Sequence, residues 1–107
     1  GWSTSTGDAD WGLRPMLATE SEPPMSFNIS YYENEKVDQL LKDGLATADE
    51  DKRGEIYGEV QDSVWKDLPL LCIASDKNIW ATSNNITGVY LLGDGSIGMR
   101  NARMAAE

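Results

Sequence analysis

The sequence contains no histidine and only one cysteine, Cys72. Without histidine, neither a Ser-His-Asp nor a Cys-His catalytic system can be assembled within this chain. Zinc sites built from histidine and cysteine are excluded for the same reason, and one cysteine cannot form an intrachain disulfide. Cys72 lies in an apolar run, where we expect a buried thiol rather than a reactive one. We therefore expect no enzymatic activity, no cofactor and no metal site.

Basic residues are scarce as well. The chain has 9 Lys and Arg against 18 Asp and Glu, which gives a formal net charge of -9 at pH 7. Binding to a nucleic-acid backbone needs clustered positive charge, so nucleic acid is not an expected partner. No stretch approaches the roughly 20 apolar residues of a membrane span, and no signal-peptide pattern is present.

The remaining bulk properties indicate one globular domain core. Hydrophobic residues make up 40% of the 107 positions and charged residues 25%, which is typical of a soluble folded protein. The sequence begins inside a motif-like segment and without an initiator methionine. We expect it to be part of a longer protein.

The first eleven residues are the most informative stretch. Two tryptophans, Trp2 and Trp11, bracket four consecutive hydroxyl residues, a glycine and the acids Asp8 and Asp10. Such a segment can stack on a ligand and hydrogen-bond it while following an irregular path, so a small-molecule contact is the sharper interpretation. A polar surface loop anchored by two indoles is the alternative. Asp8 and Asp10 also leave open a calcium-binding or hydrolytic domain.

The middle of the chain predicts a helical hairpin. Asn34 opens a helix whose apolar face is Val37, Leu40, Leu41 and Leu45. Asp49 is a good N-cap for a second helix that runs to Asp67 and buries Ile56, Tyr57, Val60, Val64 and Trp65. Gly54 and Gly58 lie inside that helix, where they could permit close approach of the two helices. Leu68-Pro69 ends it.

The flanking regions are expected to be irregular or β in character. Residues 1–33 are expected to be mostly irregular because they contain Pro15, Pro23 and Pro24. Apolar residues alternate over 25–31, which predicts a short strand or an extended packing segment there. Residues 70–74 and 78–82 are expected strands, the second with a buried Trp80. Asp94-Gly95 predicts a type I′ hairpin turn. A phosphate loop over 93–98 is set aside because no helix follows. The fold class is therefore α+β.

The order of motifs resembles the peptide-type periplasmic solute-binding proteins of ABC transporters, which serve dipeptides, oligopeptides, nickel and glutathione. The form Trp2-Ser3-Thr4-Ser5-Thr6-Gly7 is most similar to the glutathione-binding branch. The resemblance continues in one order through residues 34–41, 53–61, 65–69, 88–90 and 94–95, so it covers nearly the whole chain.

This resemblance implies a C-terminal fragment of a two-lobed, type II binding protein of the peptide-binding cluster. Residues 1–75 would belong to the second lobe, with a ligand segment over 1–12 and the helical hairpin over 34–67. A hinge return around Ser75-Asp76 would lead into the C-terminal strands of the first lobe, over 76–107. The isolated fragment would expose apolar surface and is expected to oligomerise.

The implied function is to bind a small peptide-like solute, glutathione or a related peptide, for delivery to a membrane permease. The parent protein would be periplasmic, either free or lipid-anchored on the outer face of the cytoplasmic membrane. The ligand-binding residues implied by the resemblance are Trp2, Ser3, Thr4, Ser5, Thr6 and Asp8. The alternative is a protein-interaction module with an acidic helical hairpin and no small-molecule ligand.

The sequence departs from the family pattern at Ser5. In dipeptide- and oligopeptide-binding members, the third residue after the tryptophan is an aspartate that pairs with the ligand's α-amino group. A serine hydroxyl cannot offer the charge-assisted hydrogen bond of a carboxylate. A ligand whose amine lies elsewhere, as in a γ-linked peptide such as glutathione, fits this change better, and Asp8 is a candidate to receive the ammonium group.

Overall fold

The computed structural model describes residues 2–75 and 77–105 of the chain. It divides into two compact units, Gly1–Cys72 and Ile73–Glu107, which are described separately here. Asp76, which belongs to the expected hinge, lies outside the described residues. The mixture of helices and short antiparallel strands is consistent with the α+β expectation. In the described part of the chain, no helix is both long and apolar enough to cross a membrane.

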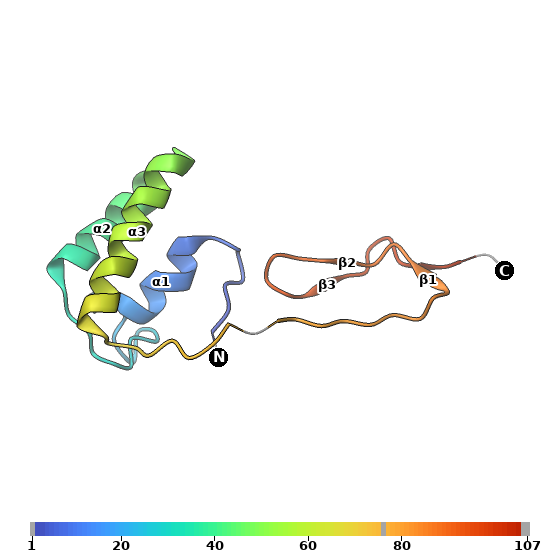
Figure 1. Cartoon of the computed structure of the whole chain (residues 1–107), viewed down its shortest axis with the longest axis horizontal. Helices are drawn as coiled ribbons and strands as arrows, with labels where there is room; N and C mark the ends of the chain where they lie inside the picture. Colours follow the sequence, from blue (N-terminus) through green and yellow to red (C-terminus); the bar gives the residue numbers. More distant parts are fainter. Residues whose placement is uncertain (1, 76, 106–107) are drawn as a thin grey trace. The chain divides into compact units, whose positions relative to one another are not determined.

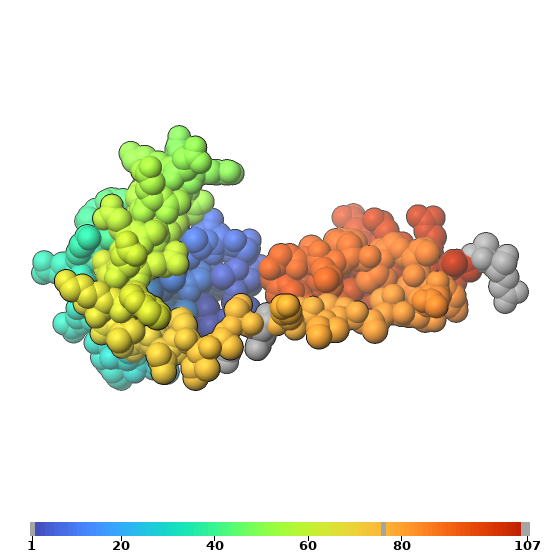
Figure 2. Space-filling model, viewed as in Figure 1, coloured from blue at the N-terminus to red at the C-terminus, as the bar shows by residue number. Residues whose placement is uncertain are grey.

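The first unit is helical. It contains α1 (Ala9–Leu17), the short 3-10 helix η1 (Thr19–Ser21), α2 (Glu35–Ala46) and α3 (Glu50–Asp67). Helix α2 packs against both α3 and α1 (Figure 1), and the atoms of the three helices form one continuous surface (Figure 2). The predicted helical hairpin is therefore confirmed.

Local hydrogen bonds set the ends of the two hairpin helices. The Asn34 side chain accepts the backbone N–H groups of Lys36 and Val37, and Asp49 accepts that of Lys52. Each cap satisfies donors that the first helical turn leaves unpaired. At the far end of α3, Leu68 adopts a left-handed conformation (φ 51°) and its N–H bonds to the Val64 carbonyl. The predicted start and end signals are confirmed.

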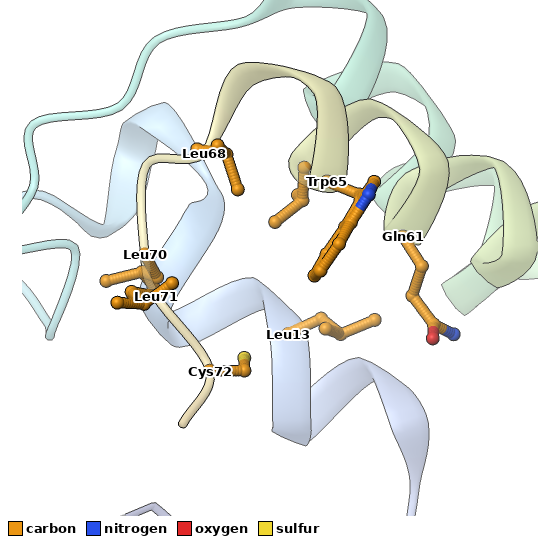
Figure 3. Close-up of a pocket in the computed structure, with 8 residues that line it drawn as sticks. Leu13, Gln61, Trp65, Leu68, Leu70, Leu71 and Cys72 are labelled. Atoms are coloured by element: carbon orange, nitrogen blue, oxygen red, sulfur yellow. The ribbon is translucent and has the colours of Figure 1, made fainter. Parts of the chain in front are cut away.

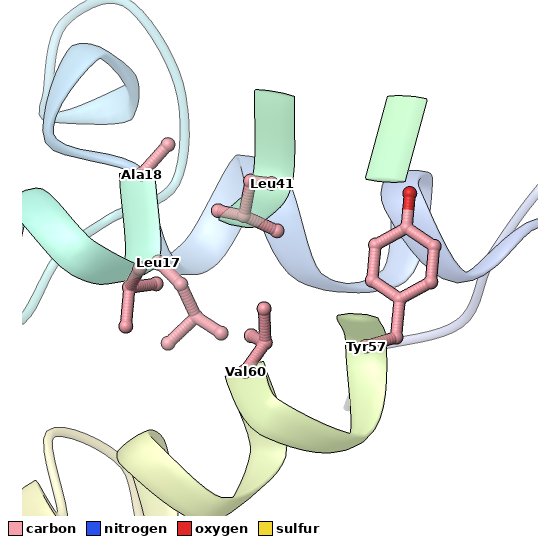
Figure 4. Packing of buried hydrophobic residues seen from close by; sticks show 6 residues of the cluster. Leu17, Ala18, Leu41, Tyr57 and Val60 are labelled. Carbon is pink, nitrogen blue, oxygen red and sulfur yellow. The ribbon is translucent and has the colours of Figure 1, made fainter. Parts of the chain in front are cut away.

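The core of this unit lies where the three helices meet. Its six buried members are Leu17, Ala18, Val37, Leu41, Tyr57 and Val60. Leu17, Leu41 and Val60 point toward one another from three different elements (Figure 4). Burying aliphatic side chains of this size stabilises a fold by about 1.5–3 kcal/mol each. The hairpin is therefore held against α1 by apolar packing.

Two residues of the predicted hairpin core do not lie in it. Leu45 is 62% exposed and Trp65 is 74% exposed, so both expectations are wrong. The buried Gly44 takes the core-facing position near the end of α2, and the ring of Tyr57 from α3 lies against it. Apart from adjacent residues and the backbone of α3 itself, no described part of the chain lies within 4 Å of a Cβ placed at Gly54 or Gly58. These glycines therefore do not mediate close approach.

Helix α1 contradicts the expectation that residues 1–33 are mostly irregular. Pro15 does not break the helix, because it stands in the last turn of α1. Proline has no N–H to donate to the Trp11 carbonyl, so the helix loses one backbone hydrogen bond at this position. The Asp8 side chain caps the helix, and an ion pair joins Asp10 to Arg14 across one turn. These interactions and the burial of Leu17 outweigh the proline.

The loop between α1 and α2 is not a strand. Residues 25–31 form turns, and the alternating apolar side chains are exposed, with Met25 at 80% and Ile29 at 72%. The fully buried Asn28 organises this loop. Its side-chain amide donates to the carbonyls of Ala18 and Tyr32 and its oxygen accepts from Ser30 and Tyr32. The loop therefore folds around one polar side chain.

The second unit contains two small antiparallel pairs. Strand β1 (Ile86–Thr87) pairs with β4 (Arg103–Met104), and β2 (Tyr90–Leu91) pairs with β3 (Ile97–Gly98) (Figure 1). The predicted hairpin at Asp94-Gly95 is confirmed. Its turn type is not, because type I′ needs positive φ at both central residues and only Gly95 in this turn has one (φ 82°).

The strands expected over 70–74 and 78–82 are absent from the described residues. Neither stretch has a partner strand there, and a strand needs a partner to satisfy its backbone groups. The side chains expected to be buried are exposed instead: Ile73 is 89% exposed, Trp80 is 51% exposed, and Cys72 is an exposed free thiol. The assignment of residues 1–75 and 76–107 to two lobes remains a prediction.

Candidate ligand-binding site

The N-terminal segment leads into α1, and its Trp2 packs against the loop between α1 and α2. The ring of Trp2 lies 5.0 Å from that of Phe27, with an interplanar angle of 59°, which is a favourable tilted arrangement of two aromatic rings. Trp2 is nevertheless 38% exposed. One part of the indole is therefore held by the loop while another remains free to contact a ligand.

The four hydroxyl residues present a largely exposed strip. The side chains of Ser3, Ser5 and Thr6 are exposed, and Thr4 is half-buried. Thr6 accepts a hydrogen bond from the backbone N–H of Asp8 at 3.2 Å. The hydroxyls of Ser3, Thr4 and Ser5 have no hydrogen-bond partner among residues 2–75 and 77–105. Three donor–acceptor groups are therefore available in consecutive positions.

Thr4 is positioned by the helix behind it. A Cβ placed on Gly12 would lie 3.0 Å from the Thr4 methyl group, closer than ordinary van der Waals contact. The missing side chain of Gly12 therefore leaves the space that the segment occupies as it passes α1.

Asp8 lies between the hydroxyl strip and α1, and its carboxylate is engaged on two sides. It accepts the backbone N–H of Asp10 at 2.8 Å and two bonds from Nη2 of Arg53 at 2.9 and 3.0 Å. The backbone N–H of Asp10 and then the guanidinium of Arg53 lower the pKa of Asp8. Asp8 is therefore a helix cap and an ion-pair partner at once.

Asp10, the second acid of the segment, is buried and paired with Arg14. Both Nε and Nη2 of Arg14 donate to the Asp10 carboxylate, at distances from 2.7 to 3.1 Å. Nη2 of Arg14 also donates to the Leu41 carbonyl at 2.6 Å, and the Tyr57 hydroxyl lies 3.4 Å from Asp10. The hydrogen bonds to Asp10 raise the pKa of Arg14, and burial raises that of Tyr57.

These pairings leave neither acid free for a cation. Each carboxylate faces a guanidinium, so Asp8 and Asp10 do not offer the open oxygen ligands that calcium requires. Within the described residues, no group of three or more histidine, cysteine, aspartate or glutamate side chains could hold a metal ion. Trp11, the second indole of the segment, lies on α1 rather than in the loop and is 48% exposed.

Sequence reasoning did not identify Arg53, Arg14 or Phe27 as parts of this region. Arg53 and Asp8 are 45 residues apart, and nothing in the sequence pairs them. The spacing of Asp10 and Arg14 is a local signal that was available, because residues four apart face each other on a helix.

An apolar pocket lies between α1, α3 and the segment that follows α3 (Figure 3). It encloses about 340 Å³, and Leu13 and Trp65 form two of its walls. Its other lining residues are Gln61, Val64, Leu68, Leu70, Leu71 and Cys72. A peptide-like ligand needs several convergent hydrogen-bonding groups. This pocket is apolar, so the N-terminal segment is the better candidate.

The chain is similar to several curated proteins, each called glutathione-binding protein GsiB. The protein from Pectobacterium atrosepticum is 42% identical over 94 residues, which are 88% of this chain and 18% of that protein. The one from Salmonella typhimurium is 40% identical over the same shares. That of Escherichia coli strain K12 is 36% identical over 102 residues, 95% of this chain and 20% of that protein. No family model matches the chain.

The chain spans about a fifth of the length of these relatives. The matches lie in the C-terminal part of each relative. The resemblance carried by the motif order is therefore confirmed over nearly all of this chain.

Proposed function

We propose that this chain, a homologue of the C-terminal part of periplasmic solute-binding proteins of ABC transporters, contributes to binding a small peptide-like solute. Glutathione or a related peptide is the proposed ligand, and a membrane permease is the proposed recipient. The observation that carries the proposal is the 36–42% identity to glutathione-binding proteins over 88–95% of the chain. The names of these relatives describe binding proteins, and we propose no enzymatic activity for this chain.

We assign Trp2, Ser3, Thr4, Ser5, Thr6 and Asp8 to the ligand site. The partly exposed indole of Trp2 offers an apolar wall. The hydroxyls that have no partner within residues 2–75 and 77–105 offer donors and acceptors to carboxylates and amides. Ser5 brings no charge to the position where α-peptide-binding members carry aspartate. The strip therefore suits a ligand that places carboxylates and amides against it rather than an ammonium group.

The rest of the proposed site would come from the remainder of a two-lobed, type II binding protein. Residues 1–75 would belong to its second lobe and 76–107 to its first, so that closure of the lobes excludes water and strengthens the polar contacts. Because the pocket is then shared between lobes, the 107-residue chain alone should bind ligand weakly or not at all. Its exposed apolar side chains support self-association of the isolated chain.

The location proposed for the parent protein is the periplasm, either free or lipid-anchored. The alternative function, an interaction module whose acidic hairpin binds another protein, is not favoured by the similarity to glutathione-binding proteins.

The test uses the full-length protein that carries this chain. Native mass spectrometry of the protein as purified should detect a retained small peptide, and calorimetry should measure its affinity for glutathione. Trp2→Ala should weaken binding by about tenfold or more, because it removes an aromatic wall. Ser5→Ala removes one neutral hydrogen bond and should weaken binding by roughly two- to tenfold.

Two control variants make the same kinds of substitution, Trp to Ala and Ser to Ala, outside the N-terminal segment. Trp65→Ala removes an exposed indole from the apolar pocket, and Ser63→Ala removes an exposed hydroxyl from α3. Neither should alter affinity. Unchanged affinity in the Trp2 and Ser5 variants would favour the interaction module, and a loss in the Trp65 variant alone would move the site to the apolar pocket.

A further inference from the structure

We propose that Arg53 is a positioning residue for ligand recognition: it holds Asp8, and Asp8 in turn fixes the hydroxyl strip instead of receiving the ligand's ammonium group. This inference rests on the proposed function, because it assigns roles within the same site. It concerns a residue on α3, far from the strip in sequence.

The guanidinium of Arg53 connects three parts of the helical unit. From α3, its Nη2 donates to both carboxylate oxygens of Asp8 at 2.9 and 3.0 Å, and its Nε donates to the carbonyl of Gly44 at 3.1 Å. That carbonyl lies in the last turn of α2, and it also accepts the N–H of Thr47, the residue after the helix, at 3.4 Å. One planar side chain thus joins the end of α2 to the start of α1.

The connection continues from Asp8 into the strip. The backbone N–H of Asp8 donates to the Thr6 hydroxyl, and its carboxylate accepts the N–H of Asp10. Asp8 therefore fixes both the last hydroxyl residue of the strip and the first turn of α1. The order of contacts runs from Arg53 through Asp8 to Thr6.

The same contacts occupy Asp8. Its carboxylate already accepts three hydrogen bonds, one from the backbone nitrogen of Asp10 and two from Nη2 of Arg53, and the positive charge that balances it belongs to Arg53. A ligand ammonium would have to displace the guanidinium or share the carboxylate with it at the cost of like-charge repulsion. The strip's side chains without a hydrogen-bond partner among the described residues are the neutral hydroxyls of Ser3, Thr4 and Ser5. Recognition there falls to neutral groups.

Holding the strip in place before the ligand arrives should increase affinity. Ordering the backbone of one released residue costs about 1–2 kcal/mol, which the ligand must otherwise supply on binding. Releasing one residue of the strip should therefore weaken binding by roughly 5- to 30-fold.

The test compares two probes, glutathione and N-acetylglutathione, which lacks the ammonium group. Calorimetry on the full-length protein measures both affinities for Asp8→Asn, Arg53→Gln, Arg53→Lys and the double variant Asp8→Asn/Arg53→Gln. Lys52→Gln is the matched control, since it removes an exposed positive charge from the neighbouring position of α3. Thermal unfolding of every variant is measured in parallel.

We expect Asp8→Asn and Arg53→Gln to weaken binding of both probes by the same factor, about tenfold. The double variant should be no weaker than either single variant, because both changes break one connection. Arg53→Lys should restore part of the affinity, since lysine keeps the charge but not the planar fork. Lys52→Gln should bind both probes like the unmodified protein.

Two results would overturn the positioning role while leaving the proposed function intact. One is an Asp8→Asn variant that loses affinity for glutathione but not for N-acetylglutathione, which would make Asp8 a direct ammonium contact. The other is an Arg53→Gln variant that melts earlier yet keeps full affinity for both probes. Failure of the unmodified protein to bind either probe would instead refute the proposed function, and the positioning role with it.

Discussion

Replacing Gly44 by alanine should destabilise the helical unit, although alanine is the better helix former. Gly44 is buried in α2, and a Cβ at this position would lie 2.7 Å from Cζ of Tyr57 and 2.9 Å from its hydroxyl oxygen. Non-bonded carbon atoms prefer about 3.5–4.0 Å, so the ring or the helix must move by roughly 1 Å. The clash involves a ring rather than the flexible end of a long side chain.

Whether Gly44→Ala stabilises or destabilises the unit depends on the size of the overpacking cost relative to the gain in helix propensity. Overpacking of this kind costs about 1–3 kcal/mol. Moving Tyr57 also disturbs its contacts with Asp10 and Arg53, at about 0.5–1.5 kcal/mol for a typical hydrogen bond. The higher helix propensity of alanine relative to glycine offsets about 1 kcal/mol of this loss. The net expectation for Gly44→Ala is a loss of about 1–3 kcal/mol of unfolding free energy.

Gly54 and Gly58 supply the matched controls. Both lie inside α3 with no atom within 4 Å of an added Cβ, so Gly54→Ala and Gly58→Ala should each stabilise the chain by about 0.5–1 kcal/mol. Urea unfolding followed by far-UV circular dichroism gives the three free energies. In a Tyr57→Leu background, where the ring is absent, Gly44→Ala should lose its penalty. A Gly44→Ala variant as stable as the two controls would refute the close-approach argument.

Three further predictions follow from burial and ionisation in the helical unit. Leu41→Ala should cost about 2–5 kcal/mol in urea unfolding because the side chain is fully buried, whereas Leu45→Ala should stay within about 0.5 kcal/mol. The pKa of Asp8 is lowered by the backbone N–H of Asp10 and by the neighbouring guanidinium, so its contribution to stability is complete above the ordinary value of 3.8. That contribution is lost as pH falls through the lowered pKa, and Asp8→Asn should flatten the acid limb of thermal melts recorded against pH. Burial raises the pKa of Tyr32 to about 12, so the protonated phenol stabilises the fold fully below about pH 10 and less as pH rises toward 12. Ultraviolet titration should find late-ionising tyrosine in the folded chain, and Tyr32→Phe should reduce that phase, leaving the share of Tyr57, whose pKa burial also raises.

The helical hairpin was predictable because its signals are local. Asn34 and Asp49 stand directly before apolar residues at helical spacing, and the structure shows both side chains capping the expected helices. Leu68-Pro69 marks the end of α3 equally well. Such signals act within a few residues, so tertiary context does not need to be known.

Helix α1 was missed because one residue was given too much weight. A proline inside a helix removes one hydrogen bond, and its cost depends on what stabilises the remaining turns. Asp8 caps α1 and Asp10 pairs with Arg14, and both signals are visible in the sequence. Weighing the cap and the ion pair against Pro15 would have predicted the helix.

The expected strands failed for a different physical reason. An apolar run such as residues 70–74 has the composition of a strand, but composition does not supply the neighbour that its backbone must bond. Ile73 is exposed and unpaired with any strand in the described part of the chain. The Asp94-Gly95 hairpin was predictable because both of its strands and its turn are contiguous.

In the candidate site too, the sequence predicts what neighbouring residues determine and misses contacts between distant residues. One such distant contact changes the chemistry of the site. The residue types of the N-terminal segment indicated a ligand contact, and Ser5 indicated a missing charge. Sequence alone left Asp8 as the substitute for that charge, because its partner on α3 lies 45 residues away. With Arg53 bound to Asp8, the segment offers hydroxyls and an indole but no uncommitted carboxylate. If the solute carries an ammonium group, the counter-charge for it must then come from outside this segment, which is why the N-acetylated probe separates the two roles of Asp8.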